Sequence, residues 1–307
     1  VNVFGSFVIH KFRPKFSLLG WKRQWEFSQW ILLKSFFVFM RFRVDNIFIS
    51  KYLAIDALGI YSVAKDVATL PAGQIIEPIM QPLYVGLSSI KDDAILLADR
   101  AHKSLSMLFI IVTPISFGTY ITADNLVNVL LGSQWQHASS IVKALAFMLI
   151  PGVVASFLTK IMMVMGRVKL IFKFEVLLSF IALGAFYFLS RGMLLSEFAL
   201  LRVLVIFFNT IFMLLFLTKL TKLSFFRILG LIVIPLLSSL VMVKYIVEIN
   251  GYIIYFSSIH QLGVQIIVGG LIYLLMISAF IYLFRNKVNE YQFIWKTFYI
   301  NIFIKGK

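Results

Sequence analysis

The sequence predicts an all-α polytopic membrane protein, and three observations support this prediction. Of the 307 residues, 61% are hydrophobic, and the mean hydropathy is +0.94. The apolar residues gather into about eight stretches, each long enough to cross the roughly 30 Å hydrocarbon core of a bilayer as a helix. The formal net charge is nevertheless +16, and most of the basic residues lie between these stretches. A soluble core does not use this much apolar surface, and the spans leave no room for a soluble domain.

The predicted spans follow one another with short connections. They cover residues 28–50, 60–86, 102–122, 140–164, 170–190, 197–218, 226–247 and 262–284. The second span contains Pro71, Pro78 and Pro82. Proline frees a backbone carbonyl and bends a membrane helix, so this span is expected to be bent and to line a wet space. Residues 123–137 are too short to span and predict an amphipathic helix on the outer surface.

The connecting segments indicate the orientation in the membrane. Alternate segments carry nineteen of the 29 basic residues: 10–23, 88–103, 166–173, 219–227 and 285–307. The intervening segments carry only Lys51, Arg191 and Lys244. Because basic loops stay on the cytoplasmic side, both ends of the chain are predicted to be cytoplasmic. Anionic headgroups on that side also explain the basic composition without a nucleic-acid partner.

Other composition and motif features restrict the chemistry. The chain has no cysteine, which excludes a disulfide framework and thiol catalysis. It contains no HExxH, no phosphate-binding glycine loop and no nucleophile elbow. The four histidines are scattered and predict neither a metal site nor a catalytic pair. The sequence therefore predicts a protein that is not an enzyme and has no metal or bound cofactor.

Ionisable residues within apolar spans are costly and mark candidate functional sites. The first span holds Lys34, Arg41, Arg43 and Asp45. At about 100° per residue, Lys34, Arg41 and Asp45 form one polar stripe, whereas Arg43 points to nearly the opposite side. The i, i+4 spacing of Arg41 and Asp45 allows them to form an ion pair. The alternatives are contact with a substrate or an internal ion pair that fixes helix packing.

The second span carries a pair of carboxylates. Asp66 and Glu77 are spaced so that a regular helix places them on one face, with Gly73 leaving space between them. Two such carboxylates can exchange protons or hold a cation. Solvation of Asp66 at the outer interface is the alternative.

The remaining charges in the spans are assigned ordinary roles. Lys143, Lys160 and Arg202 lie near span ends, from which a long side chain reaches the interface. Glu175 is expected to pair with Lys173 or Lys169 near the inner end of its span. Asn209 and Thr210 are polar groups in mid-span that could serve a cation, but they are expected to form hydrogen bonds between helices.

Three motifs carry a resemblance to a known family. Between residues 45 and 93, Asp45, Leu58-Gly59, Tyr61, Leu70-Pro71, Pro78 and Asp92-Asp93 match in order. The segment LVNVLLGSQWQHAS, residues 126–139, and Gly166-Arg167 follow at the expected spacing. Over about residues 12–170, the chain resembles the bacterial polysaccharide and O-antigen flippases, the Wzx type of the multidrug/oligosaccharidyl-lipid/polysaccharide exporter superfamily. The family's basic residue three positions before the aspartate has no direct counterpart, because Phe42 occupies that position between Arg41 and Arg43.

This resemblance implies a division of the chain. The family has two six-helix bundles that face a central cavity. Residues 28–218 would form the second bundle, residues 219–284 two additional C-terminal helices, and residues 285–307 a basic aromatic tail on the cytoplasmic side. Residues 1–27 would hold the end of an earlier span and a basic loop. Because the sequence starts with Val1, we expect the N-terminal lobe to precede this chain in the same protein.

The resemblance also implies an activity. The family flips a lipid-diphosphate-linked oligosaccharide across the bacterial inner membrane, for O-antigen, capsule or exopolysaccharide synthesis. Undecaprenyl diphosphate would be the lipid carrier. The two bundles would expose the cavity between them to each side of the membrane in turn. Candidate groups for the diphosphate or sugar are Arg41, Arg43 and Lys34; candidates for coupling to Na⁺ or H⁺ are Asp45, Asp66 and Glu77.

Three other interpretations stay open. A drug antiporter of the same superfamily would use membrane carboxylates against a cationic substrate, and an excess of acid in the cavity would mark it. A polymerase or acyltransferase of polysaccharide assembly usually needs a large outer loop or a histidine-based site. Finally, the fragment alone can be inactive, since half a cavity cannot alternate.

Overall fold

The computed structural model describes residues 21–53 and 55–300. These residues form helices joined by short connections, and none of them lies in a β-strand. The predictions made for residues 1–20, and for the end of the tail at 301–307, lie outside the described residues.

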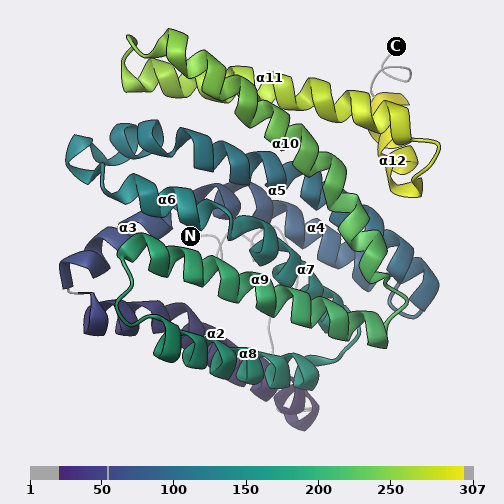
Figure 1. The fold of residues 1–307 in the computed structure, drawn as a ribbon. Helices are drawn as coiled ribbons and strands as arrows, with labels where there is room; N and C mark the ends of the chain where they lie inside the picture. Colours follow the sequence, from purple (N-terminus) through teal and green to yellow (C-terminus); the bar gives the residue numbers. More distant parts are fainter. Residues whose placement is uncertain (1–20, 54, 301–307) are drawn as a thin grey trace, which may run out of the picture.

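The helices are labelled in Figure 1. They are α2 (Trp21–Tyr52), α3 (Ile55–Pro71), the π-helix η1 (Ala72–Ile76), α4 (Glu77–Ser88), α5 (Ala94–Leu131), the 3₁₀ turn η2 (Ser133–Trp135), α6 (Ala138–Ala146), α7 (Leu149–Val164), α8 (Val168–Leu189), α9 (Leu195–Leu220), α10 (Phe225–Ile253), α11 (Ser258–Phe284), α12 (Asn289–Ile294) and the π-helix η3 (Trp295–Ile300).

The all-α polytopic fold is confirmed, and the number of apolar spans is smaller than predicted. Among the described helices, α5, α8, α9, α10 and α11 are long and apolar enough to cross a membrane. The helices α6 and α7 meet at 45° and make a sixth span if they cross together. The first two of the eight predicted spans are helical but do not reach the same apolar character. The ionisable residues of α2 lower its hydropathy, and the second predicted span is divided into three pieces.

The second predicted span is interrupted where its prolines lie. The N–H of Glu77 donates to the carbonyl of Ala72, five residues earlier, so the turn between α3 and α4 is a π-turn. Pro78 follows directly and has no N–H to donate, which favours a break in the regular pattern here. The wider turn rotates α4 relative to α3. The predicted shared face of Asp66 and Glu77 assumed a regular helix and is therefore not formed.

Helix α5 is longer than its predicted span. The side chain of Asp93 accepts hydrogen bonds from the N–H groups of Ile95 and Leu96 and so caps the start of the helix. The helix then runs for 38 residues, about 57 Å, to Leu131, where Gly132 with φ of 92° ends it. The prediction of a separate surface helix over 123–137 is wrong, because most of that segment continues α5.

The helices pack in an order that places α5 between two groups. In Figure 1, α2 and α8 lie along one edge of the molecule and α11 lies along the opposite edge, while α10 runs obliquely from the end of α9 across α5 to α11. Buried apolar side chains form two large clusters, mainly among α2 to α9, and a third cluster among α10, α11 and α12. Partly buried side chains of α5 pack against this third cluster.

Polar contacts fasten the α10–α11 hairpin to α5 along much of its length. The hydroxyl of Tyr273 on α11 donates to the carbonyl of Ile110, at 2.7 Å. Further along α5, Asn125 donates to Gln265, at 3.1 Å. These bonds satisfy polar groups where an apolar helix pair has no hydrophobic driving force to associate in lipid.

Candidate functional site

The candidate site is a cavity of about 430 Å³ lined by residues of α2, α4, α7, α8 and α9. Its ionisable lining residues are four basic ones, Lys34, Arg41, Lys160 and Arg202, and two acidic ones, Glu77 and Glu175. Its other polar lining residues are Ser156, Thr159, Asn209 and Thr210. A polar space of this size within apolar helices is the kind of feature that marks a transport pathway.

Small side chains on α7 leave room for this cavity. Gly152, Ala155, Ser156 and Thr159 line it and lie at spacings of three and four, which places them on one face of the helix. Thr210 on α9 donates to the carbonyl of Pro151 at 3.0 Å and so holds α7 and α9 together beside this face. The predicted interhelical hydrogen bond of Thr210 is confirmed.

One ion pair crosses the cavity wall between α2 and α8. Nη2 of Arg41 lies 2.9 Å from Oε2 of Glu175. The Glu175 side chain is only 8% exposed and that of Arg41 only 20%, so both charges are largely removed from solvent. Removing either partner would leave the other as a buried, uncompensated charge. The predicted pairings of Arg41 with Asp45, and of Glu175 with Lys173 or Lys169, are wrong.

A second cluster of charges surrounds Asp45, which is fully buried. Its Oδ2 atom lies 3.0 Å from Nζ of Lys65 and accepts a hydrogen bond from the Tyr61 hydroxyl at 3.1 Å. Its Oδ1 atom lies 3.2 Å from Nη1 of Arg202. Asp45 belongs to α2, Lys65 and Tyr61 to α3, and Arg202 to α9, so one carboxylate ties three helices together.

Asp45 also positions one of the side chains that line the cavity, that of Arg202. The Arg202 side chain is 2% exposed and lines the cavity while its guanidinium pairs with Asp45. The guanidinium also lies 5.9 Å from the centroid of the Phe186 ring, within reach of a cation–π contact.

The structure distributes the predicted site residues unequally. Lys34 and Arg41 line the cavity, as does Glu77 at the start of α4. Arg43 lies on the exposed side of α2, 5.6 Å from the Phe39 ring, as its predicted direction indicated. Asp66 is exposed and is not among the residues that line the cavity.

Sequence reasoning missed three residues of the site. Lys160, Glu175 and Arg202 line the cavity, although ordinary roles near span ends were assigned to them. Glu175 and Arg202 are 6% and 2% exposed, so neither reaches the interface. Their occurrence as charges in otherwise apolar spans was the available signal, because a charge that far from a polar loop requires a partner within the bundle.

Comparisons with known proteins indicate the class of protein to which this fold is similar. A family described as "Polysaccharide biosynthesis protein" matches residues 1–140. In the known structure of lipid II flippase MurJ, inward closed conformation, 58% of that chain corresponds to 91% of this one, with a TM-score of 0.65 and 16% identity. This likeness shows the fold: a polytopic helical arrangement that this chain shares with a flippase.

The individual relatives are proteins of bacterial polysaccharide synthesis. The chain is 27% identical to the lipopolysaccharide biosynthesis protein WzxC of Escherichia coli K12 over 188 residues, which are 60% of this chain and 38% of WzxC. It is 25% identical to the succinoglycan biosynthesis transport protein ExoT of Rhizobium meliloti over 148 residues, 48% of this chain and 30% of ExoT.

These matches confirm the resemblance to polysaccharide flippases that the motifs indicated. The chain corresponds to less than two fifths of the length of either curated relative. Of these two relatives, ExoT carries an activity in its name, and that activity is transport, in agreement with the prediction of a membrane transport protein rather than an enzyme.

Proposed function

We propose that this chain forms one lobe of a flippase that carries a lipid-diphosphate-linked oligosaccharide across the bacterial cytoplasmic membrane. The observation that carries the proposal is the excess of basic side chains around the cavity, with four basic and two acidic residues among its ionisable lining. Lys34 and Lys160 have no carboxylate within 4.0 Å among the described residues, so their charges are not neutralised by a direct partner.

The chemistry of such a substrate fits this site. A diphosphate is strongly charged, and its passage through the apolar part of a bilayer requires opposite charges held in place. Lys34 and Lys160 supply positive charge without fixed geometry, and Arg41 can add a contact to phosphate through the guanidinium nitrogens that do not pair with Glu175. A cavity of about 430 Å³ accommodates the diphosphate and adjoining sugar, while the undecaprenyl chain remains in the bilayer.

A second lobe of the same protein would provide the facing wall of the cavity. The relatives are longer than this chain, which supports the proposal of further helices in the intact protein. Two lobes that rock about the cavity would expose it to each side in turn, which is alternating access. In the proposed orientation, the tail after α11 lies on the cytoplasmic side, because the basic segments are concentrated at that end of the spans.

Coupling to Na⁺ or H⁺ is best assigned to Glu77. This carboxylate lines the cavity and has no basic partner within 4.0 Å among the described residues. Asp45 is occupied by Lys65 and Arg202, and Asp66 lies away from the cavity. Of the three predicted coupling residues, Glu77 alone therefore offers an unpaired carboxylate to the transport space within the described part of the chain.

The test removes cavity charge without breaking an ion pair. We expect Lys34→Gln combined with Lys160→Gln to lower export of the surface polysaccharide at least tenfold, because two of the four cations are lost. Arg43→Gln combined with Lys51→Gln is the matched control, since it removes two basic charges from exposed positions of α2. The measurement is export in cells that express equal amounts of each intact protein.

Two results would contradict the proposal. Normal export by the Lys34 and Lys160 variant would exclude a role for cavity charge in substrate passage. Equal losses in the test and control variants would show that total charge matters rather than the cavity. A drug antiporter, the alternative class, requires an acidic site, and the basic lining of the cavity argues against it.

A further inference from the structure

A second cavity lies apart from the transport site, between the end of α4 and the first turns of α5. Its volume is about 390 Å³. Its lining includes the apolar residues Leu83, Leu87 and Met107, the basic residues Arg100 and Lys103, and the ring of Phe293. We call this cavity the α4–α5 groove. It combines apolar side chains with two cations.

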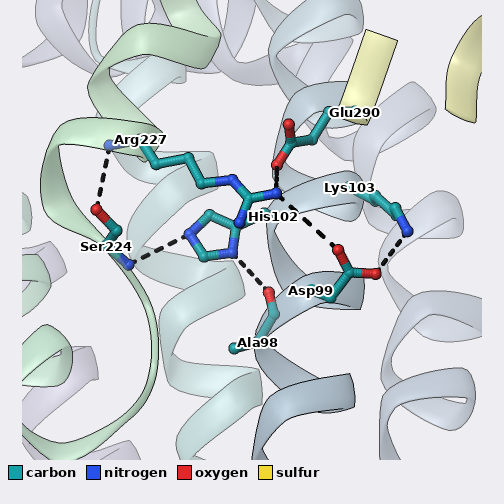
Figure 2. A network of polar contacts seen from close by, with 7 residues as sticks. All are labelled: Ala98, Asp99, His102, Lys103, Ser224, Arg227 and Glu290. Atoms are coloured by element: carbon teal, nitrogen blue, oxygen red, sulfur yellow. Dashed lines mark hydrogen bonds and ion pairs between the residues drawn. The ribbon is translucent and has the colours of Figure 1, made fainter. Parts of the chain in front are cut away.

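A polar network holds the parts of this groove together (Figure 2). Arg227 lies at the start of α10, and its Nη2 atom is 2.6 Å from Oε1 of Glu290 and 4.0 Å from Oδ1 of Asp99. Glu290 has a side chain only 2% exposed and belongs to α12, so this pair fastens the tail to α10. Asp99 in turn pairs with Lys103, one turn further along α5.

His102 connects α10 to α5 in the same network. Its Nδ1 atom lies 2.7 Å from the carbonyl of Ala98, and its Nε2 atom accepts the N–H of Ser224, the residue that caps α10, at 3.3 Å. The start of α10 is thereby fixed beside the first turns of α5. Arg227 is held in position to receive the tail.

Helix α12 places an aromatic ring beside the two cations of the groove. Phe293 follows Glu290 by one turn of α12. Its ring centroid lies 5.2 Å from Nζ of Lys103 and 5.9 Å from the guanidinium carbon of Arg100. Both distances are within cation–π range, so the ring holds the two cations near each other.

The charge of the groove is positive. Arg100 and Lys103 are its only ionisable lining residues among those described. Lys103 is balanced by Asp99, whereas Arg100 has no carboxylate within 4.0 Å in the described part of the chain. One exposed guanidinium thus stands uncompensated beside an apolar wall.

We propose that the α4–α5 groove binds one anionic phospholipid of the surrounding bilayer. Its phosphate lies against Arg100 and Lys103, and one acyl chain follows the wall formed by Leu83, Leu87 and Met107. Basic pockets between membrane helices on the cytoplasmic side recognise anionic headgroups in this way. The segment 88–103 is one of the basic segments predicted to face the cytoplasm, where anionic headgroups are concentrated. The apolar wall favours a lipid over a soluble phosphate.

The experiment measures lipid retention by the intact protein purified in neutral detergent. Native mass spectrometry counts the bound molecules after addition of phosphatidylglycerol, phosphatidylcholine or glycerol 1-phosphate. We expect one phosphatidylglycerol to be retained in preference to the other two. Arg100→Gln should weaken its retention about fivefold, the effect of one basic residue near an anionic surface. Arg100→Lys should keep most of the retention, because it keeps the charge.

Lys91→Gln is the matched control. Lys91 is exposed and lies in the same basic segment, but it does not line the groove, so its variant should retain phosphatidylglycerol as the unchanged protein does. Equal retention of phosphatidylcholine would overturn the role of the anionic headgroup. Equal binding of glycerol 1-phosphate would overturn the role of the acyl chain. Equal losses with Lys91→Gln and Arg100→Gln would show an effect of general surface charge.

Discussion

At the residue scale, the surroundings of the Asp45 carboxylate bear on what this charge can do. A carboxylate that couples transport to a cation must be open to that cation in one state. Both oxygens of Asp45 are instead occupied, by Lys65 and Tyr61 on one side and Arg202 on the other. In this arrangement Asp45 pairs with Arg202 at the cavity wall and joins three helices.

This arrangement predicts the effect of removing one negative charge. Asp45→Asn should lower the free energy of unfolding by about 3 kcal/mol, because Lys65 and Arg202 lose their shared counter-charge in a buried place. Thermal unfolding of the purified protein in detergent measures this as a drop of about 5 °C or more in the melting temperature.

Asp66→Asn is the control for this substitution. It removes the same charge from an exposed position of α3 and should change the free energy of unfolding by less than about 0.5 kcal/mol. If Asp45→Asn is as mild as its control, the three-helix ion cluster does not stabilise the fold.

The directions of charges in α2 follow from the sequence, and their partners do not. The 100° step per residue separates Arg41 from Arg43, and the structure places Arg41 at the cavity and Arg43 on the exposed side. Glu175, the partner of Arg41, lies more than 130 positions away in the chain. A local rule such as i, i+4 pairing cannot rank so distant a partner, because the packing of α2 on α8 decides it.

At the element scale, the second predicted span shows what prolines do and do not reveal. Three prolines indicated a bent helix, because each removes a backbone donor, and the regular helix is interrupted between Pro71 and Pro78. The prolines did not indicate that this interruption would take the form of a π-turn. The extra residue in that turn rotates Glu77 away from the face expected for Asp66, so the predicted carboxylate pair separates while Glu77 still reaches the cavity.

The α10–α11 hairpin depends on the close approach of its two helices at Gly269. A Cβ atom at this position would lie 2.7 Å from Cδ1 of Ile246, closer than packed carbon atoms approach. Gly269→Leu should therefore separate the helices and lower the free energy of unfolding by about 1–3 kcal/mol, the usual cost of overpacking. Chemical or thermal unfolding in detergent measures the loss.

Gly270→Leu is the neighbouring control. A Cβ atom there meets nothing within 4 Å, and the residue is exposed. Its variant should unfold as the unchanged protein does. Similar losses for both leucine variants would mean that helix propensity or side-chain size, rather than the contact with Ile246, determines the effect.

At the scale of the whole molecule, hydropathy predicted where the helices lie. It predicted less well which of them are apolar enough to span a membrane. Each of the eight apolar stretches coincides with a helix or with an interrupted helix. The stretches at 28–50 and 60–86 differ from the others because the first holds Lys34, Arg41, Arg43 and Asp45, and the second holds three prolines together with Lys65, Asp66 and Glu77. Hydropathy averages these residues with their apolar neighbours. It therefore predicts a span where the structure has a helix with a polar face.

The orientation of the molecule is open to a direct test. The chain has no cysteine, so a single introduced cysteine is the sole labelling site within these 307 residues. We expect Ser257→Cys, between α10 and α11, to react with a membrane-impermeant maleimide in intact spheroplasts. Asp92→Cys, between α4 and α5, should react only after permeabilisation, because its segment is predicted to be cytoplasmic.

Both positions are exposed, so access across the membrane rather than burial decides the outcome. The opposite labelling pattern would invert the proposed orientation. It would also place the α4–α5 groove in the other leaflet.

The hydrogen bonds between α5 and the α10–α11 hairpin have a consequence for the order of events during synthesis. Asn125 and its partner Gln265 are separated by 140 residues, and Asn128 and Ser258 by 130. At about 5–20 residues per second, the ribosome needs roughly 7–28 s to make the second member of the first pair. Throughout that interval α5 is present without these partners. Until the α10–α11 hairpin attaches, other groups must satisfy the polar side chains of α5 that it will later bind.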